Sequence, residues 1–319
     1  MKTALHRPFI PSSGLTLLEL LVVLSILAVL STVALTSSSG LADQARYEAT
    51  QRTLENIREA VLGPANLRDT DGTLLYTGFV ADTGRLPRAV LNGADFALVE
   101  LWENVNGMAL HEVRAAEDAF VDDDDHDDPE VFLATGWRGP YLNLAPGSDE
   151  IIDGWGAPFV LRTQAGGAVA AITDEIGQVH SFGADQLENL ADTGYERDMA
   201  KRFEESQIDS SIAVTVELRN SDGTPAVAVP TDSIMVRLFS PDPTNGLIRV
   251  EPDEDPFSSS SLTFNFTNQT PGPRVVRAYY DEGNNDTPAD DASIESKSAI
   301  TNFILRPGGN QRTIILTVP

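Results

Sequence analysis

The first feature of the chain is an apolar run near its amino terminus. From Leu15 to Leu35 the sequence reads LTLLELLVVLSILAVLSTVAL, which matches the ~20 residues that a helix needs to cross a bilayer. Glu19 is the only charged residue in this run. A carboxylate costs about 2.5–3.5 kcal/mol at the centre of a membrane helix, and less near its end. We therefore expect Glu19 to have a functional partner.

An amphipathic pattern follows the apolar run. Between Leu41 and Leu62 apolar residues recur at roughly helical spacing, with charged residues between them. Gly63-Pro64 is a helix stop signal. The pattern predicts one long helix over residues 15–62, on the order of 70 Å at ~1.5 Å per residue.

The pattern changes twice more along the chain. Residues 63–205 predict a head that contains helix and sheet, with long loops. Residues 206–319 contain short alternating runs separated by turn clusters, which is typical of an all-β sandwich. The alternating runs are 212–218, 233–239, 262–266, 274–280 and 313–318. The predicted fold class is α+β, and the C-terminal part loosely resembles transthyretin-like or other Ig-like accessory domains.

The segment before the apolar run is polar and carries Lys2 and Arg7. The positive-inside rule predicts that this leader is cytoplasmic and that the bulk of the chain is outside the cytoplasm. A secretory signal peptide cleaved near Ala34 or within residues 36–40 is one alternative. A plain signal anchor with an incidental Glu19 is another.

The order Gly14-Leu15-Thr16-Leu17-Leu18-Glu19 resembles the class III signal of type IV pilins and pseudopilins. The resemblance implies that the prepilin peptidase removes the leader 1–14 by cutting after Gly14, and then N-methylates Leu15. It also implies that residues 15–62 remain as an anchor and assembly helix. The family usually has Phe at this position. Leu15 departs from that pattern but is also apolar.

Cleavage before Leu15 would place a new α-ammonium group close to the Glu19 carboxylate. In a filament, the ammonium group of one subunit can pair with Glu19 of a neighbour at low dielectric, where an unpaired charge is costly. Glu19 would then favour one axial stagger between subunits. The run 36–40 contains poor helix formers, so we expect it to unwind when subunits pack, or to be a simple hinge at the membrane surface.

Residues 12–205 further resemble the major pseudopilin of type II secretion systems. The resemblance lies in the stretches 82–87, 136–142, 153–160 and 181–185, and it implies a small antiparallel sheet behind the stem helix. The aromatic residues of this region are expected in the core rather than in a binding site: Phe79, Trp102, Trp137, Tyr141, Trp155 and Phe159. The domain at 206–319 departs from that family and weakens an assignment as the major subunit.

The acidic loop after Ser181 is the best candidate for a metal site, because Ca²⁺ binds carboxylate and carbonyl oxygens. The pseudopilin resemblance implies a structural Ca²⁺ held by Asp185 and Asp198, then Asp192, with the Ser181 carbonyl as a further ligand. The alternative is a solvated acidic loop. Two other acidic runs, 122–128 and 281–291, are expected to be exposed loops rather than cation sites.

Composition excludes several classes of function. The chain has 48 acidic and 22 basic residues, a net charge of −26 and no cysteine. Such a charge argues against nucleic-acid binding, and the lack of cysteine excludes disulfides and thiolate metal sites. No catalytic motif is found, so we expect no enzymatic activity.

These observations predict a filament subunit, either of a type IV pilus-like structure or of a type II secretion pseudopilus. Its expected partners are prepilin peptidase, other copies of itself, other pilins or pseudopilins, and an inner-membrane assembly platform. The expected location is the inner membrane as a single-pass protein with its globular part in the periplasm. The assembled filament would lie in the periplasm or at the cell surface. The alternatives are a surface or tip pilin whose β domain is an adhesin, a non-polymerising binding module, and an unrecognised enzyme.

Overall fold

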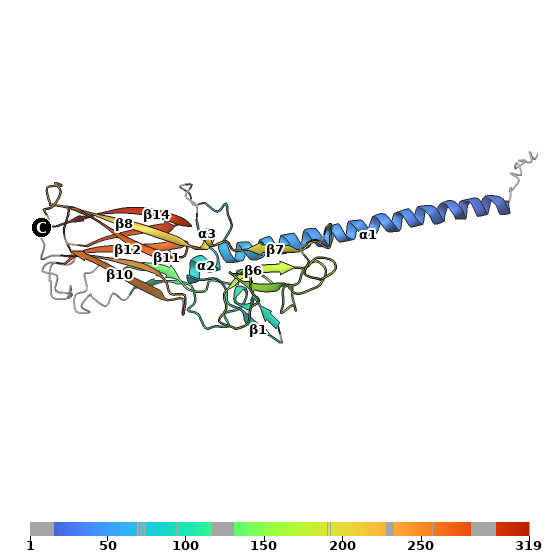
Figure 1. The fold of residues 1–319 in the computed structure, drawn as a ribbon, viewed down its shortest axis with the longest axis horizontal. Coiled ribbons are helices and arrows are strands. Elements are labelled where there is room, and N and C mark those ends of the chain that lie inside the picture. Colours follow the sequence, from blue (N-terminus) through green and yellow to red (C-terminus); the bar gives the residue numbers. More distant parts are fainter. Residues whose placement is uncertain are drawn as a thin grey trace, which may run out of the picture.

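The computed structural model describes residues 16–68, 70, 72, 75–93, 95–116, 131–189, 191, 193–227, 233–256, 258–281 and 298–318. The side chains of residues 33–39, 254–256 and 281 lie outside that description. The described chain forms a long helical stem, a head and a β-rich C-terminal part (Figure 1). The predicted α+β class with a C-terminal β domain is confirmed. The predicted acidic loops 122–128 and 281–291 lie outside the described residues, except for the backbone of Asp281.

The stem is helix α1, which spans Leu17–Leu62 and contains 46 residues. It ends at Gly63, whose φ of 80° is a conformation that favours glycine. The helix is continuous through residues 36–40, so the isolated subunit shows no interruption there. Unwinding of this run inside a filament stays a prediction.

The head consists of short elements around the carboxyl-terminal half of the stem. Strands β5, β6 and β7 form an antiparallel sheet, and β1–β2 and β3–β4 form two antiparallel pairs. The elements are α2 (Phe79–Thr83), β1 (Val90–Asn92), β2 (Asp95–Ala97), the 3-10 helix η1 (Val99–Leu101), β3 (Glu112–Ala115), β4 (Phe132–Thr135), β5 (Val160–Thr163), β6 (Ile176–Ser181) and β7 (Met199–Arg202).

One face of α1 forms a wall of the head core. Its buried residues include Leu54, Ile57 and Val61, spaced three and four apart so that they share one face of the helix. They join Leu161 and Val179 of the sheet in one apolar cluster. The six aromatic residues predicted for the core are all buried in this cluster or packed against it.

The stem and the head meet closely at Gly154. A Cβ atom at Gly154 would collide with the backbone carbonyl of Arg46 on α1. The Gly154 N–H donates to the buried Thr50 hydroxyl at 2.9 Å, and that hydroxyl donates to the Arg46 carbonyl at 3.0 Å. The Asp-Gly-Trp-Gly turn is therefore built to contact the helix backbone directly.

The C-terminal part forms two sheets. One has the order β10-β9-β12-β13, and the other has the order β11-β8-β14, in which β14 and β8 are parallel. Alternate residues of these strands face each other across one apolar core. The elements are α3 (Glu205–Ile208), β8 (Ser210–Arg219), β9 (Ser233–Pro241), β10 (Ile248–Pro256), β11 (Ser261–Gln269), β12 (Gly272–Asp281), β13 (Ser298–Leu305) and β14 (Gly308–Thr317).

The head also packs against the sheet β10-β9-β12-β13, on the face that points away from the core between the two sheets. Val131 and Leu133, at and beside β4, form an apolar cluster with Phe239 of β9 and Val275 of β12. Figure 1 shows the resulting arrangement, in which the strands β8–β14 lie beyond the carboxyl-terminal end of α1 and continue the long axis of the molecule. The predicted division at residues 205/206 stays a prediction, although α3 lies at this point.

Candidate functional site

The predicted assembly residue Glu19 lies in the first turn of α1 and is held by the residue that caps the helix. Its Oε2 accepts hydrogen bonds from the Thr16 backbone N–H at 3.0 Å and from the Thr16 hydroxyl at 3.1 Å. The Thr16 hydroxyl in turn accepts from the Glu19 N–H at 3.2 Å. This reciprocal pair is a capping box. The Thr-x-x-Glu spacing was available in the sequence as a capping signal.

The amino-terminal half of α1 projects away from the rest of the molecule (Figure 1). Leu17, Leu21 and Leu30 are all more than half exposed, as are most of the apolar residues between them. Within the part of the chain that the structure describes, no helix meets the length and hydropathy needed to cross a membrane. The predicted membrane anchor therefore stays a prediction. Gly14 and Leu15, the predicted cleavage and methylation sites, lie outside the described residues.

Two of the predicted calcium ligands, Asp185 and Asp198, lie at the two ends of the loop between β6 and β7. Asp185 Oδ1 accepts from the Leu187 N–H at 3.1 Å, and Asp198 Oδ2 accepts from the Asn189 N–H at 3.1 Å. Asp198 Oδ1 is buried and has no hydrogen-bond partner among the described residues. An unpaired buried carboxylate oxygen is costly, so this atom fits a bound cation.

The rest of the predicted ligand set is less complete. Asp192 lies outside the described residues. The Ser181 hydroxyl donates to Asp153 Oδ2 at 2.7 Å, so it stabilises the 153–157 turn. The role of the Ser181 carbonyl as a ligand stays a prediction. Among the described residues, no group of three or more acidic or histidine side chains is placed to hold a metal. Asp185 and Asp198 can therefore supply only part of a Ca²⁺ coordination shell, which needs 6–8 oxygens.

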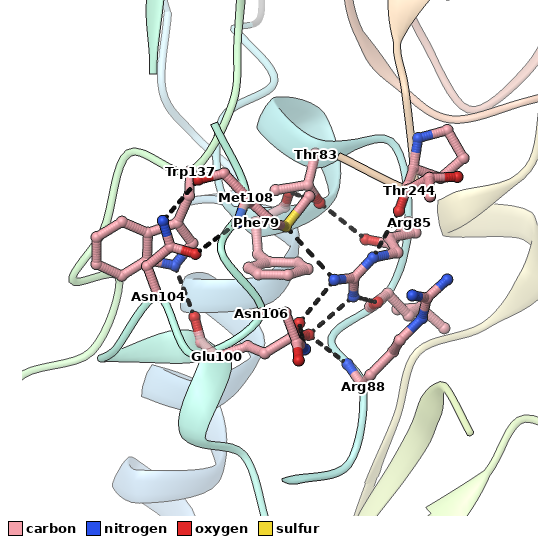
Figure 2. Close-up of polar contacts among 12 residues, drawn as sticks. Phe79, Thr83, Arg85, Arg88, Glu100, Asn104, Asn106, Met108, Trp137 and Thr244 are labelled. Carbon is pink, nitrogen blue, oxygen red and sulfur yellow. Dashed lines mark hydrogen bonds and ion pairs between the residues drawn. The ribbon is translucent and has the colours of Figure 1, made fainter. Parts of the chain in front are cut away.

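Sequence reasoning missed a buried ion pair between Arg85 and Glu100 of the head, which Figure 2 shows with its polar contacts. Their side chains are 2% and 3% exposed. Arg85 donates from Nη2 to Glu100 Oε1 at 2.6 Å and from Nη1 to Oε2 at 2.8 Å. Its guanidinium group also lies over the Phe79 ring, 5.3 Å from the centroid. Burial opposes the charge on Glu100, but hydrogen bonds from Arg85, the Arg88 N–H and Asn106 outweigh it and lower its pKa.

Arg85 also connects the head to the β sandwich. Its Nε donates to the carbonyl of Pro243 at 2.9 Å, in the connection between β9 and β10. The Ala109 N–H donates to the Asn245 carbonyl of the same connection at 2.8 Å. A Cβ atom at Gly84 would collide with the Pro241 carbonyl. The β9–β10 connection is therefore held against the head by backbone contacts as well as by the Arg85 side chain.

A second buried carboxylate of the head belongs to Asp82 of α2. Its Oδ1 accepts from Arg138 Nη2 at 2.6 Å, and its Oδ2 accepts from the Tyr141 hydroxyl at 3.1 Å. His111 Nε2 lies 3.8 Å from Oδ1. Burial raises the pKa of Asp82 to about 6, although Arg138 and Tyr141 favour its charged form. The desolvation of the carboxylate thus outweighs its partners.

Replacing Asp82 with Asn is expected to change how stability depends on pH. The folded-state pKa of about 6 lies above the ordinary value of about 3.9, so Asp82 destabilises the fold progressively as the pH rises from about 4 to about 6. At about 1.36 kcal/mol per pKa unit this loss is roughly 3 kcal/mol. Asp82→Asn should therefore gain stability relative to the wild type over this range, measured by urea unfolding at pH 4 and pH 7. Parallel pH profiles of the two proteins would contradict this.

Comparison with known proteins identifies the amino-terminal segment. The family model described as the prokaryotic N-terminal methylation motif matches residues 11–35. No curated protein and no solved structure matches the chain. The match includes Gly14, Leu15 and Glu19, whereas the resemblance of the head to pseudopilins lies outside it and stays a prediction. Residues 11–35 carry a type IV prepilin-like signal, which implies processing by prepilin peptidase and assembly with other pilins.

Proposed function

We propose that the chain is a structural, non-enzymatic subunit of a type IV pilus-like or type II secretion pseudopilus filament. Prepilin peptidase cuts it after Gly14 and N-methylates Leu15, and the stem holds it in the inner membrane with its head in the periplasm. One observation carries the proposal most directly. Glu19 lies at the start of a 46-residue helix whose amino-terminal half projects away from the rest of the described chain (Figure 1), with its large apolar side chains from Leu17 to Leu30 exposed. Such a surface needs a lipid or protein partner.

The capping box suggests how Glu19 acts before and after assembly. In the isolated subunit the carboxylate accepts hydrogen bonds from Thr16, so its charge is partly compensated. In a filament, the α-ammonium group of a neighbouring Leu15 would be a stronger partner, because opposite charges attract strongly at low dielectric. Assembly then replaces the hydrogen bonds between Glu19 and Thr16 within one subunit with an ion pair between two subunits. The second subunit is another copy of the chain or another pilin or pseudopilin. The acidic chain has no role with nucleic acid in this proposal.

The shape of the molecule favours a second, more specific role at the end of a filament. The β sandwich continues the long axis beyond the stem (Figure 1), so it extends away from the membrane when the stem is anchored. In a shaft, the heads of more distal subunits need that space. At the tip nothing lies beyond the sandwich, which would be presented to a surface or to secreted cargo. A tip subunit, with the β domain as an adhesin or binding module, is therefore the alternative to a shaft subunit.

Immunogold labelling of sheared filaments, with an antibody raised against the chain, tests both roles. We expect gold particles on filaments in the wild type and none in a strain that lacks the gene. Gold only at filament ends supports the tip role, and regular gold along the filament supports the shaft role. Chain that remains in the membrane fraction, with no label on any filament, contradicts the proposal.

We also propose that the loop containing Asp185 and Asp198 binds Ca²⁺ as a structural ion. The support is the buried Oδ1 of Asp198, which has no hydrogen-bond partner among the described residues, and the closure of the loop by the hydrogen bond from the Ala184 N–H to the Tyr195 carbonyl at 2.9 Å. Asp192 and the Ser181 carbonyl are the further ligands of this proposal. The bound ion would hold the loop in one conformation for subunit contact.

Isothermal titration of the full chain with CaCl₂ is expected to give a binding heat in the wild type. Asp198→Asn should reduce the affinity by about tenfold or more, because it removes a charged ligand from the site. Asp174→Asn is the matched control, since Asp174 also accepts backbone hydrogen bonds, but in the 170–174 turn. A wild type without Ca²⁺ heat, or equal losses in both variants, would reject the ion site.

A further inference from the structure

An open hollow of about 510 Å³ is lined in part by Asp82 and its partners Arg138 and Tyr141. It is lined by the carboxyl-terminal part of α1 and Pro64, by residues within 77–82, and by the segment 138–143. The residues that matter here are Asn56, Glu59, Asp82, Arg138, Tyr141 and Asn143. The stem, α2 and the 138–143 segment are far apart in sequence, so only the folded head forms this hollow.

The charges at the base of the hollow compensate each other. Asp82 is 2% exposed and pairs with Arg138 at 2.6 Å. Tyr141 donates its hydroxyl proton to the same carboxylate. The Asp82 carboxylate and the Arg138 guanidinium group therefore neutralise each other, and the pair offers no net charge to a charged ligand. The Arg138 side chain is still 47% exposed, so it has donors that face solvent.

The walls present polar groups that the fold itself does not use. Asn56, Glu59 and Asn143 are exposed, and no hydrogen bond or ion pair of their side chains is found in the described part of the chain. Two amides and a carboxylate offer both donors and acceptors. Ala60, Pro64 and Leu142 contribute apolar surface to the same hollow.

The hollow is also held in shape by its surroundings. The Tyr141 and Leu142 N–H groups donate to the Leu101 carbonyl at 2.8 and 3.0 Å. The Tyr141 ring contacts the rings of Phe79 and Trp137 edge-on, with centroids 5.6 and 6.1 Å apart. The 138–143 wall is therefore fixed to the core, and a ligand would meet a preformed site.

We propose that this hollow binds a neutral polyhydroxylated ligand, a saccharide. Sugar hydroxyls both donate and accept hydrogen bonds, which matches the amides of Asn56 and Asn143, the Glu59 carboxylate and the free donors of Arg138. The apolar surface suits the C–H face of a sugar ring. An anionic ligand is disfavoured by Glu59 and by the net charge of −26. A metal ion is disfavoured by the Arg138 guanidinium group that lines the hollow. The site is independent of the proposed filament role.

Saturation-transfer difference NMR on the full chain tests the site, in a zwitterionic detergent that contains no sugar. The probes are glucose, galactose and N-acetylglucosamine, with glycylglycine as a zwitterionic comparison. We expect at least one of the sugars to bind the wild type. The double variant Asn56→Ala/Asn143→Ala should bind that sugar about tenfold more weakly, because each lost hydrogen bond reduces affinity several-fold.

Asn265→Ala is the matched control, because Asn265 is an exposed asparagine on β11 of the sandwich, away from the hollow. It should bind the sugar as the wild type does, and unchanged thermal unfolding of the double variant shows that its fold is intact. The proposal is overturned if none of the three sugars binds, or if the double variant binds as tightly as the wild type. Binding of glycylglycine in place of the sugars also overturns it.

Discussion

Replacing Arg85 with Ala is expected to destabilise the protein by about 3–5 kcal/mol, the usual cost of removing one partner from a buried ion pair. The change leaves the Glu100 carboxylate, which is 3% exposed, without its main partner. It also removes the hydrogen bond to the Pro243 carbonyl, so the β9–β10 connection loses its side-chain tie to the head. Urea unfolding followed by tryptophan fluorescence at neutral pH measures the loss.

Two further variants separate charge burial from packing. Arg219→Ala breaks an exposed pair with Glu217, whose side chains are 44% and 40% exposed, and should cost less than about 1 kcal/mol. The double variant Arg85→Met/Glu100→Met removes both charges and should recover much of the loss, because apolar replacements of similar volume often match a buried pair. An Arg85→Ala variant as stable as Arg219→Ala would show that Glu100 is compensated by other groups.

Replacing Glu19 with Gln is expected to abolish filament assembly while leaving membrane insertion and leader removal intact. Glutamine can still complete the capping box with Thr16, so the start of α1 keeps its hydrogen bonds. The change removes the negative charge that would pair with the neighbouring α-ammonium group. Sheared filament yield by immunoblot, together with the mass of the membrane-bound chain, measures assembly and processing separately.

The controls for this result address capping and charge elsewhere on the stem. Thr16→Ala removes the cap and keeps the charge, so it should assemble better than Glu19→Gln. Glu48→Gln removes an exposed carboxylate that pairs with Arg52 on the same helix, and should assemble normally. Wild-type filament yield from Glu19→Gln would mean that the glutamate serves only as a helix cap, and the proposed intersubunit pairing would be wrong.

Much of the secondary structure was predictable from local patterns. Helix α1 follows from the apolar run, the amphipathic repeat and the Gly63-Pro64 stop, and all five alternating runs after residue 206 lie within observed strands or overlap them. Two strands were missed. β10 contains Pro252 and Pro256 among acidic residues, and proline argues against a strand except at a sheet edge, which is where β10 lies. β13 has no clear polar and apolar alternation.

One candidate site residue, Glu19, could be recognised from the sequence, whereas the buried carboxylates Asp82 and Glu100 could not. Glu19 was found because a lone charge in an apolar run violates a simple solvation rule. Asp82 and Glu100 lie in segments with ordinary charge density, and nothing in the sequence marks them as buried. Their partners Arg138 and Arg85 are 56 and 15 residues away, so no local spacing connects them.

The sequence alone determined the features that depend on neighbouring residues: the long stem helix, its caps, the prepilin-like signal and the β-rich character of the C-terminal part. Helix propensity, capping and strand alternation act over a few residues, so they can be predicted from the sequence. Only the tertiary structure decided the parallel pairing of β14 with β8, the Arg85–Glu100 pair with its tie to Pro243, and the hollow beside Asp82. These features depend on which segments, distant in the sequence, pack against each other. That packing sets how far a charge is removed from water and where the core closes.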